Sequence, residues 1–406
     1  MKQHACCEAV VGVTFHGEVR PAPIVRVIHG NHAIMRELLP VVCLTTLILL
    51  GCEPPGTPPA SETPNTATEQ ISNNPAPDSS EAVAAVEAAA GKVERDAAGF
   101  LVLADFRGKT VSNEVARHLP SLNRLQSLLL NEAQLEADVL QFVGECVGLR
   151  QLDLRDCSLA NEDLVHLKNL TNLKALRLSG KTGATTVDDA GMAYLAPLKN
   201  LKVLLLDFLW VSGEGLSQLA SLDGLEELYL AGTLVGDEDL KYLAQFPQLK
   251  KLRVSKLSQV SLAGLEEISK LAALQDLDLS ENSSIFDDDV APLAKLTTLK
   301  RLNLWRVAIT DRGVAHLEGL VNLEWLNLDN TQMTDAGVKS LGHMHKLRFL
   351  HLGSTALSDA GLPDLARLTS LRDLKVTRTA VTEAGVTELQ KQLPETTIQL
   401  KYLESE

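Results

Sequence analysis

Side chains suited to molecular recognition recur at a fixed spacing in the C-terminal part of this 406-residue chain. Three sets of residues are each spaced by 24 positions: Arg301, Trp325 and Phe349; Asn303, Asn327 and His351; and Trp305, Asp329 and Gly353. Aromatic rings stack on apolar groups, and the amide, carboxylate and imidazole groups beside them exchange hydrogen bonds. Exposed aromatic residues surrounded by polar groups are typical of binding surfaces. The pattern therefore predicts a surface that binds a protein or a glycan.

Local packing is the alternative explanation of the aromatic residues. In that case Trp325 and Phe349 pack only on each other, and Arg301 lies over a ring. The other residues at equivalent positions carry mixed charge, with Arg253 and Asp278 as examples. We expect those charges to be solvated.

A second, weaker cluster has the same mixed character. It comprises Leu205, Asp207 and Tyr229, together with Phe208. The candidate partner-binding residues are therefore Arg301, Asn303, Trp305, Trp325, Asn327, Asp329, Phe349, His351, Tyr229 and Asp207.

Catalytic and metal sites find little support in the sequence. The acidic run 287–289 suggests a cation site, but Asp287 and Asp288 are expected to cap a helix, as Thr-Asp does in other repeats. The ten histidines show no paired metal spacing, and Cys146 and Cys157 occupy inward positions typical of core thiols. No phosphate loop or nucleophile elbow stands out. We predict no enzymatic activity, no cofactor and no bound metal.

These candidate residues are positioned by a repeated pattern, Leu-x-x-Leu-x-Leu. Clear copies start at Leu125 and continue to Leu371, with most steps of 24 residues, one of 28 and two of 25. A weaker copy at Leu101 precedes them, and a truncated copy ends at Leu400. The alternation of apolar residues within each copy predicts a short strand whose leucines point inward.

The rest of each repeat predicts a helix. In the phrase NTQMTDAGVKSL, Thr334 can supply a capping oxygen and Asp335 lies near the positive end of the helix dipole. Val338, Leu341 and Met344 then recur at every third position, which places them on the inward face. One such unit cannot bury its apolar face alone, whereas stacked units share a continuous core and pair their strands in parallel.

A 24-residue period with this pattern resembles the leucine-rich repeats of bacterial lipoproteins, over about residues 97–403. The resemblance implies an α/β solenoid shaped like a horseshoe, with a parallel sheet on the concave side and short helices on the convex side. The third, fifth and seventh residues of each copy would face solvent on thirteen strands. We expect residues 81–96 to form an N-terminal cap helix and residues 97–406 to form the repeat domain. At the far end, the polar residue Glu395 is expected to protect the exposed edge.

The N-terminal region has the character of an export signal. Residues 38–50 are an apolar run of 13, which is short for a membrane span but typical of a signal peptide. The next residues complete Leu49-Leu50-Gly51-Cys52, which resembles a bacterial lipobox. We therefore interpret residues 35–52 as a lipoprotein signal peptide with Cys52 as the lipidated residue. Ordinary signal cleavage, an uncleaved anchor and a buried strand are the alternatives.

Two flanking segments are expected to lie outside the repeat domain. Residues 1–34 show no apolar periodicity, and our hypothesis is that translation begins at Met35, which makes them a non-native extension. Residues 53–80 contain seven prolines and almost no apolar side chains, so they are predicted to form a disordered tether.

The net charge of −14 argues against nucleic acid or an anionic membrane surface as the main partner. The sequence as a whole predicts a non-enzymatic, extracytoplasmic binding protein, held by lipid to the bacterial cell envelope on the periplasmic side or at the cell surface. Two alternatives remain open, a cytosolic repeat adaptor or regulator and a structural envelope component that uses its lateral faces.

Overall fold

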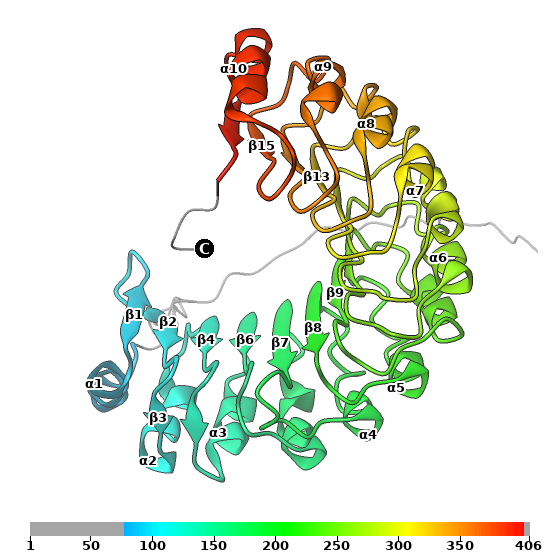
Figure 1. The fold of residues 1–406 in the computed structure, drawn as a ribbon. Coiled ribbons are helices and arrows are strands. Elements are labelled where there is room, and N and C mark those ends of the chain that lie inside the picture. The colour runs from blue at the N-terminus through cyan, green and yellow to red at the C-terminus, as the bar shows by residue number, and fades with distance from the viewer. Residues whose placement is uncertain (1–76, 402–406) are drawn as a thin grey trace, which may run out of the picture. The chain divides into compact units, whose positions relative to one another are not determined.

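The computed structural model describes residues 77–401, which form a curved array of repeats (Figure 1). The expected extension, the signal peptide and most of the tether lie outside the described residues. Within residues 77–401, no helix has the length and apolar character needed to cross a membrane.

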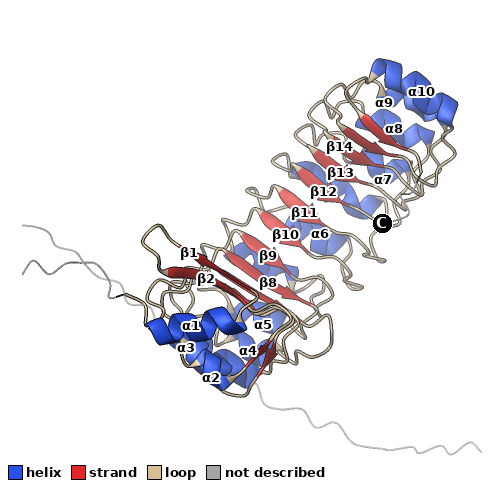
Figure 2. Ribbon diagram, turned by 90° about the vertical axis from the view of Figure 1, so that its left-hand side faces the viewer, coloured by secondary structure: helices blue, strands red, loops and turns tan. Residues whose placement is uncertain are grey.

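The array is organised around one long sheet on the inner side of the curve, with short helices on the outer side (Figures 1 and 2). Thirteen of its strands pair in parallel and in chain order, and β1 adds an antiparallel strand at the N-terminal edge. This arrangement confirms the expected solenoid. The strands are β1 (Lys92–Arg95), β2 (Leu101–Asp105), β4 (Ser127–Leu129), β6 (Gln151–Asp153), β7 (Ala175–Ser179), β8 (Val203–Asp207), β9 (Glu227–Tyr229), β10 (Lys251–Arg253), β11 (Asp276–Asp278), β12 (Arg301–Asn303), β13 (Trp325–Asn327), β14 (Phe349–His351), β15 (Asp373–Lys375) and β16 (Thr397–Gln399).

The outer elements are α-helices in some repeats and 3₁₀ helices in others. A second, two-stranded sheet pairs β3 (Thr110–Val111) with β5 (Gln134–Leu135). The α-helices are α1 (Ser80–Ala89), α2 (Asn113–Ala116), α3 (Val139–Glu145), α4 (Asp189–Met192), α5 (Gly213–Gln218), α6 (Leu262–Ile268), α7 (Asp311–Ala315), α8 (Asp335–Leu341), α9 (Leu362–Leu365) and α10 (Glu383–Gln392). The 3₁₀ helices are η1 (Leu119–Ser121), η2 (Asn161–Asn169), η3 (Leu240–Gln245), η4 (Asp288–Lys295) and η5 (Asp359–Gly361).

The inward leucines form the continuous core that the pattern predicts. Leu326 and Leu350 are fully buried and lie opposite each other on β13 and β14. The helical residues Val338, Leu341 and Met344 are fully buried as well. Each repeat therefore closes its core against the neighbouring repeats.

Hydrogen bonds between repeats explain why the phrase Asp-Ala-Gly recurs. The carboxylate of Asp311 accepts hydrogen bonds from the backbone N–H of Thr334 and from its hydroxyl, both at 2.7 Å. Asp335 accepts the same pair of bonds from Ser358 in the next repeat, at 2.7 and 2.6 Å. Thr334 in turn accepts a hydrogen bond from Ala336 N–H at 3.2 Å, which confirms it as a helix cap. The Asp thus joins adjacent repeats in addition to favouring its own helix N-terminus.

The acidic residues at two other helix starts have different roles, which corrects one expectation. Asp188 caps its own helix by accepting from Ala190 N–H at 2.9 Å. Asp287 makes no capping bond to η4 and instead accepts from Thr310 N–H at 2.6 Å and from Gly313 N–H at 3.0 Å. Burial raises the pKa of Asp287, but the hydrogen bonds from Thr310 and Gly313 outweigh burial and leave the pKa below its usual value. The register of the repeat places Asp287, rather than Asp288, in the linking position.

We expect replacement of Gly337 by alanine to lower the free energy of unfolding by about 1–3 kcal/mol, as overpacking does in well-packed interiors. An added Cβ would lie 2.5 Å from Asp311 Oδ1 and 2.6 Å from Met333 Cγ, and that oxygen is held by its bond to Thr334. Gly319 is a matched control, because a Cβ there meets no atom within 4 Å. Thermal or chemical unfolding of the two variants checks this; a Gly337→Ala protein as stable as Gly319→Ala would contradict it.

The N-terminal cap is not a single helix over residues 81–96, as predicted, but a shorter helix followed by a strand. Helix α1 ends at Ala89, and residues 92–95 form β1, an antiparallel strand that covers the edge of β2. Asp78, at the end of the expected tether, accepts hydrogen bonds from Leu101 N–H at 2.9 Å and from Asn123 N–H at 2.8 Å. The last residues of the segment 53–80 therefore belong to the folded unit.

Candidate functional site

An aromatic platform, which we define as Arg301, Trp325 and Phe349, lies on the concave side of β12, β13 and β14. The rings of Trp325 and Phe349 are stacked, with centroids 5.0 Å apart and planes inclined by 7°. The guanidinium carbon of Arg301 lies 4.5 Å from the centroid of Trp325. Strand register places the three residues directly opposite one another. The rings pack on each other as the alternative explanation predicted, yet both side chains remain half-buried rather than enclosed.

Paired charges extend the same row of third-position residues toward the N-terminus. Lys251 Nζ lies 2.7 Å from Glu227 Oε1, and Arg301 Nε lies 3.3 Å from Asp276 Oδ2. Burial raises the pKa of Asp276, an effect that the charge of Arg301 opposes. Arg301 is therefore held between a carboxylate on one strand and the Trp325 ring on the next, so it is oriented before any partner binds.

A concave groove of about 610 Å³ lies beside the platform. It is lined by Asp207, Phe208 and Tyr229 from the second cluster and by Asn303 and Trp305 from the first. The curve of the sheet thus joins two groups of candidates that lie four strands apart in the order β8 to β12. A smaller hollow of about 220 Å³ is lined by Tyr229, Asn303 and Trp325, and it links the groove to the platform.

Arg253 organises the floor of this groove, although its sequence position suggested only a solvated charge. Its guanidinium lies 3.1 Å from Asp207 Oδ2 and 3.4 Å from Asp278 Oδ2. Burial raises the pKa of Asp207, and the charge of Arg253 opposes that rise. Burial also raises the pKa of the Tyr229 hydroxyl, with a smaller contribution from Glu227. The sequence does hold a signal for Arg253. It occupies the fifth position of its repeat, and the fifth positions of the two flanking repeats are Tyr229 and Asp278.

The seventh-position residues are less exposed than the sequence pattern predicted. Asp207 and Asp329 are 8 % and 7 % exposed, and Thr377 is 2 % exposed. In most repeats the next residue has positive φ, as at Phe208 (61°), so the chain turns directly after this position. Trp305, Asn131 and Arg155 are only partly buried, although a residue with positive φ follows each of them as well. The guanidinium carbon of Arg306 lies 5.4 Å from the Trp305 ring centroid.

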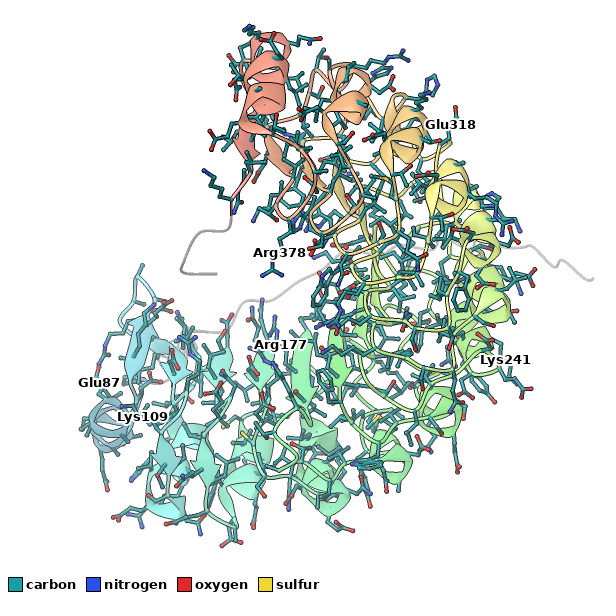
Figure 3. All side chains as sticks on the ribbon, in the orientation of Figure 1. Glu87, Lys109, Arg177, Lys241, Glu318 and Arg378 are labelled. Carbon is teal, nitrogen blue, oxygen red and sulfur yellow. The ribbon has the colours of Figure 1, made fainter. Side chains whose placement is uncertain are left out.

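The remaining candidates complete a polar strip beside the platform. The carboxamide oxygens of Asn303 and Asn327 accept from the backbone N–H groups of Trp305 at 3.2 Å and Asp329 at 2.9 Å. The ring of His351 meets that of Phe349 edge-on, with centroids 6.4 Å apart. Figure 3 shows Arg177 and Arg378 on the same concave side, whereas Lys241 and Glu318 project from the convex side.

Other reactive groups in residues 77–401 are buried or dispersed. Burial raises the pKa of the Cys146 thiol to about 12 and that of Cys157 to about 11, so both are unreactive core thiols. No group of three or more metal-ligating side chains in this part of the chain could hold a metal ion. The concave surface offers stacking, hydrogen bonding and paired charge, which are means of binding.

Comparison with known proteins agrees with this architecture. The family model described as leucine rich repeat matches residues 297–357. The structure of an internalin (InlF) from Listeria monocytogenes is similar with 20 % identity and a TM-score of 0.54, covering 75 % of this chain and 87 % of that one. Internalin C2 from the same species shows 24 % identity and a TM-score of 0.40, covering 52 % of this chain and 83 % of that one. The functional domain of InlJ from Listeria monocytogenes, which includes a cysteine ladder, shows 18 % identity and a TM-score of 0.44. The match covers 64 % of this chain and 50 % of that one. No curated protein matches the sequence.

Proposed function

We propose that the protein is a non-enzymatic binding protein, and that its leucine-rich repeat solenoid holds a partner protein on the concave surface. The observation that carries the proposal is the half-buried stack of Trp325 on Phe349. Aromatic residues with oriented Arg neighbours are enriched among the side chains that dominate binding energy at interfaces. The adjoining groove supplies hydrogen-bonding groups around this apolar centre.

The geometry favours a protein over a glycan. A sugar stacks on an open aromatic face, but Arg301 and Phe349 lie on the strands that flank Trp325 and both contact its ring. What Trp325 presents to the concave space is its edge, which suits apolar or aliphatic side chains of a protein. A glycan is the second candidate. Trp305 at the groove favours it, because within residues 77–401 the Trp305 ring stacks on no other aromatic ring and only the guanidinium of Arg306 lies over it.

The charge of the chain bears on the partner as well. A net charge of −14 favours neutral or basic partners and disfavours nucleic acid. The platform and groove carry paired rather than single-signed charge. Specificity would therefore rest on the positions of individual groups rather than on a general field.

A pull-down experiment tests whether the concave face binds a partner protein. The full chain is immobilised and incubated with envelope extract, and the retained proteins are compared among variants. A partner held on the concave face should be lost after substitutions there and kept after Lys241→Ala on the convex side. Competition with free sugars would show whether a glycan carries the contact. Equal capture by all variants would contradict the proposal.

The location that we propose is extracytoplasmic, with lipid attachment at Cys52. Support comes from the apolar run at residues 38–50, the lipobox-like sequence that ends at Cys52 and the proline-rich segment after it. Several acyl chains hold a protein firmly to a bilayer, whereas one chain holds it only reversibly. The cytosolic adaptor and the structural envelope component are the competing assignments.

Replacing Cys52 by serine should move the protein from the membrane fraction to the soluble or secreted fraction, because the acceptor for the lipid is removed. Fractionation of cells that express the full chain measures this change. Cys157→Ser is the matched control, since that thiol is buried in the core far from any lipidation sequence. A wild-type chain that fractionates with the cytosol would favour the adaptor instead.

A further inference from the structure

A pocket of about 380 Å³ lies apart from the concave groove, at the edge of the array where β4, β6 and β7 begin. It is lined by three cationic side chains, three amide side chains and one glycine, and none of the described residues that line it is acidic. Its volume falls within the range of small-molecule sites, about 300–1,000 Å³. We call it the basic pocket, after its cations Arg124, Arg150 and Lys174.

Two of these cations occupy equivalent positions on consecutive repeats. Arg150 and Lys174 are the second residues of their repeats, directly before β6 and β7, and Lys174 N–H donates to the Arg150 carbonyl at 2.7 Å. Neighbouring strands lie about 4.8 Å apart, so the two charged side chains start side by side. Like charges in directly opposite positions of a sheet are destabilising. An anion between them would remove this repulsion.

Further along the same row of second residues, the chain supplies that anion itself. Glu226 lies between Lys202 and Lys250 in the row, and its carboxylate oxygens are 3.4 and 2.7 Å from their ammonium nitrogens. Arg150 and Lys174 are both exposed, and within residues 77–401 neither side chain forms an ion pair or a hydrogen bond. The basic pocket is therefore open to solvent and lacks the counter-charge that Glu226 provides elsewhere.

Arg124 forms the wall of the pocket toward the N-terminal cap. Its guanidinium lies 2.7 Å from Asp96 Oδ2, and its central carbon lies 4.3 Å from the ring centroid of Phe100. The cap thus orients Arg124 and already balances its charge. An incoming anion would be held mainly by Arg150 and Lys174.

We propose that the basic pocket binds a phosphate group, carried by an anionic lipid headgroup or by a soluble phosphate ester. A guanidinium and an ammonium donate from different directions, and a phosphate has more acceptor oxygens to meet them than a carboxylate has. The net charge of −14 does not prevent this, because exposed charges farther away than about 8 Å are largely screened at physiological salt.

The place of the pocket in the fold favours the lipid source. Asn123, another lining residue, donates its backbone N–H to Asp78 at 2.8 Å, so the segment that follows Cys52 joins the folded unit beside the pocket. With lipid attached at Cys52, headgroup binding here would add a second membrane contact near the point of attachment. This choice of source rests on the proposed location, whereas phosphate binding does not.

The test measures binding of soluble probes to the full chain by saturation-transfer NMR titration. Glycerol 3-phosphate represents the free ester, and dihexanoyl phosphatidylglycerol below its micelle concentration represents the lipid headgroup. Glutarate is the comparison anion, because it carries two carboxylates and no phosphate.

A pair of double variants separates the pocket from general electrostatics. Arg150→Gln with Lys174→Gln removes the two cations that have no partner and keeps polar side chains at exposed positions, so this protein should fold. Lys241→Gln with Lys295→Gln is the matched control, because it removes the same charge from exposed residues of η3 and η4 on the outer side. Unfolding curves of both proteins confirm that the fold is kept.

We expect wild type and the control to bind at least one phosphate probe, and the pocket variant to bind it about ten times or more weakly. Tighter binding of the lipid probe than of the free ester would support the lipid source, and the reverse would assign the pocket to a soluble ester. Equal affinity for glutarate, binding that survives in the pocket variant, an equal loss in the control, or no binding of either phosphate would overturn the inference. Partner capture on the concave face should be unchanged in the pocket variant, so the proposed function stands or falls separately.

Discussion

Replacing Trp305 and Trp325 together by alanine should weaken binding of the captured partner by more than about 30-fold, the equivalent of about 2 kcal/mol. Trp305 lines the concave groove and Trp325 belongs to the aromatic platform, so the pair removes an apolar anchor from each half of the surface. Loss of Trp325 also releases Arg301 from the ring that holds it. Titration of the purified partner against both proteins gives the affinity ratio.

The third tryptophan provides a matched control. Trp210 is 60 % exposed, and it lies outside the concave strands, in a loop that bridges to Asp188 at a helix start. We expect Trp210→Ala to leave affinity unchanged. If Trp210→Ala abolished binding and the double variant did not, the lateral face would be the functional one, and the structural envelope component would replace our proposal. Unfolding curves of all variants separate lost contacts from lost structure.

The core could be predicted from sequence because burial alone determines it. An apolar residue at a fixed period must face its equivalents in the next repeat, and Leu326 and Leu350 do so. The platform could be predicted for the same reason, since strand register follows from the 24-residue spacing of Trp325 and Phe349. A period fixes which residues are neighbours across adjacent strands.

The groove could not be predicted, because the resemblance implied a curved array but not how strongly the sheet bends. Asp207 at the end of β8 and Trp305, which follows β12, line one groove although their strands are four positions apart in the sheet. The burial of Asp329 could not be predicted either, because the pattern of leucines does not specify how deeply the seventh residue of each repeat packs. The linking role of Asp311 was missed for a related reason, since its partner Thr334 is 23 residues away.

Replacing Leu350 by alanine should lower the free energy of unfolding by about 2–5 kcal/mol. Leu350 is fully buried and lies in register between Leu326 and Leu374, so its removal opens a cavity that two neighbouring repeats share. Surface substitutions usually change stability by less than about 0.5 kcal/mol, and Val321→Ala, at a site that is 45 % exposed, is the control. Chemical unfolding of both variants measures the difference.

The position of Leu350 in a one-dimensional array adds a second, stronger expectation. Each repeat contacts only its neighbours, so a weak link near one end should separate the terminal repeats from the rest. Hydrogen exchange should therefore lose protection over residues 347–401, which include β14, β15 and β16, while the repeats before β12 keep theirs. The same opening would remove Phe349 and Gly353 from the concave face, so Leu350→Ala should also reduce partner binding. Uniform loss of protection along residues 77–401 would show instead that the solenoid unfolds as one cooperative unit, and that the recognition surface depends on every repeat equally.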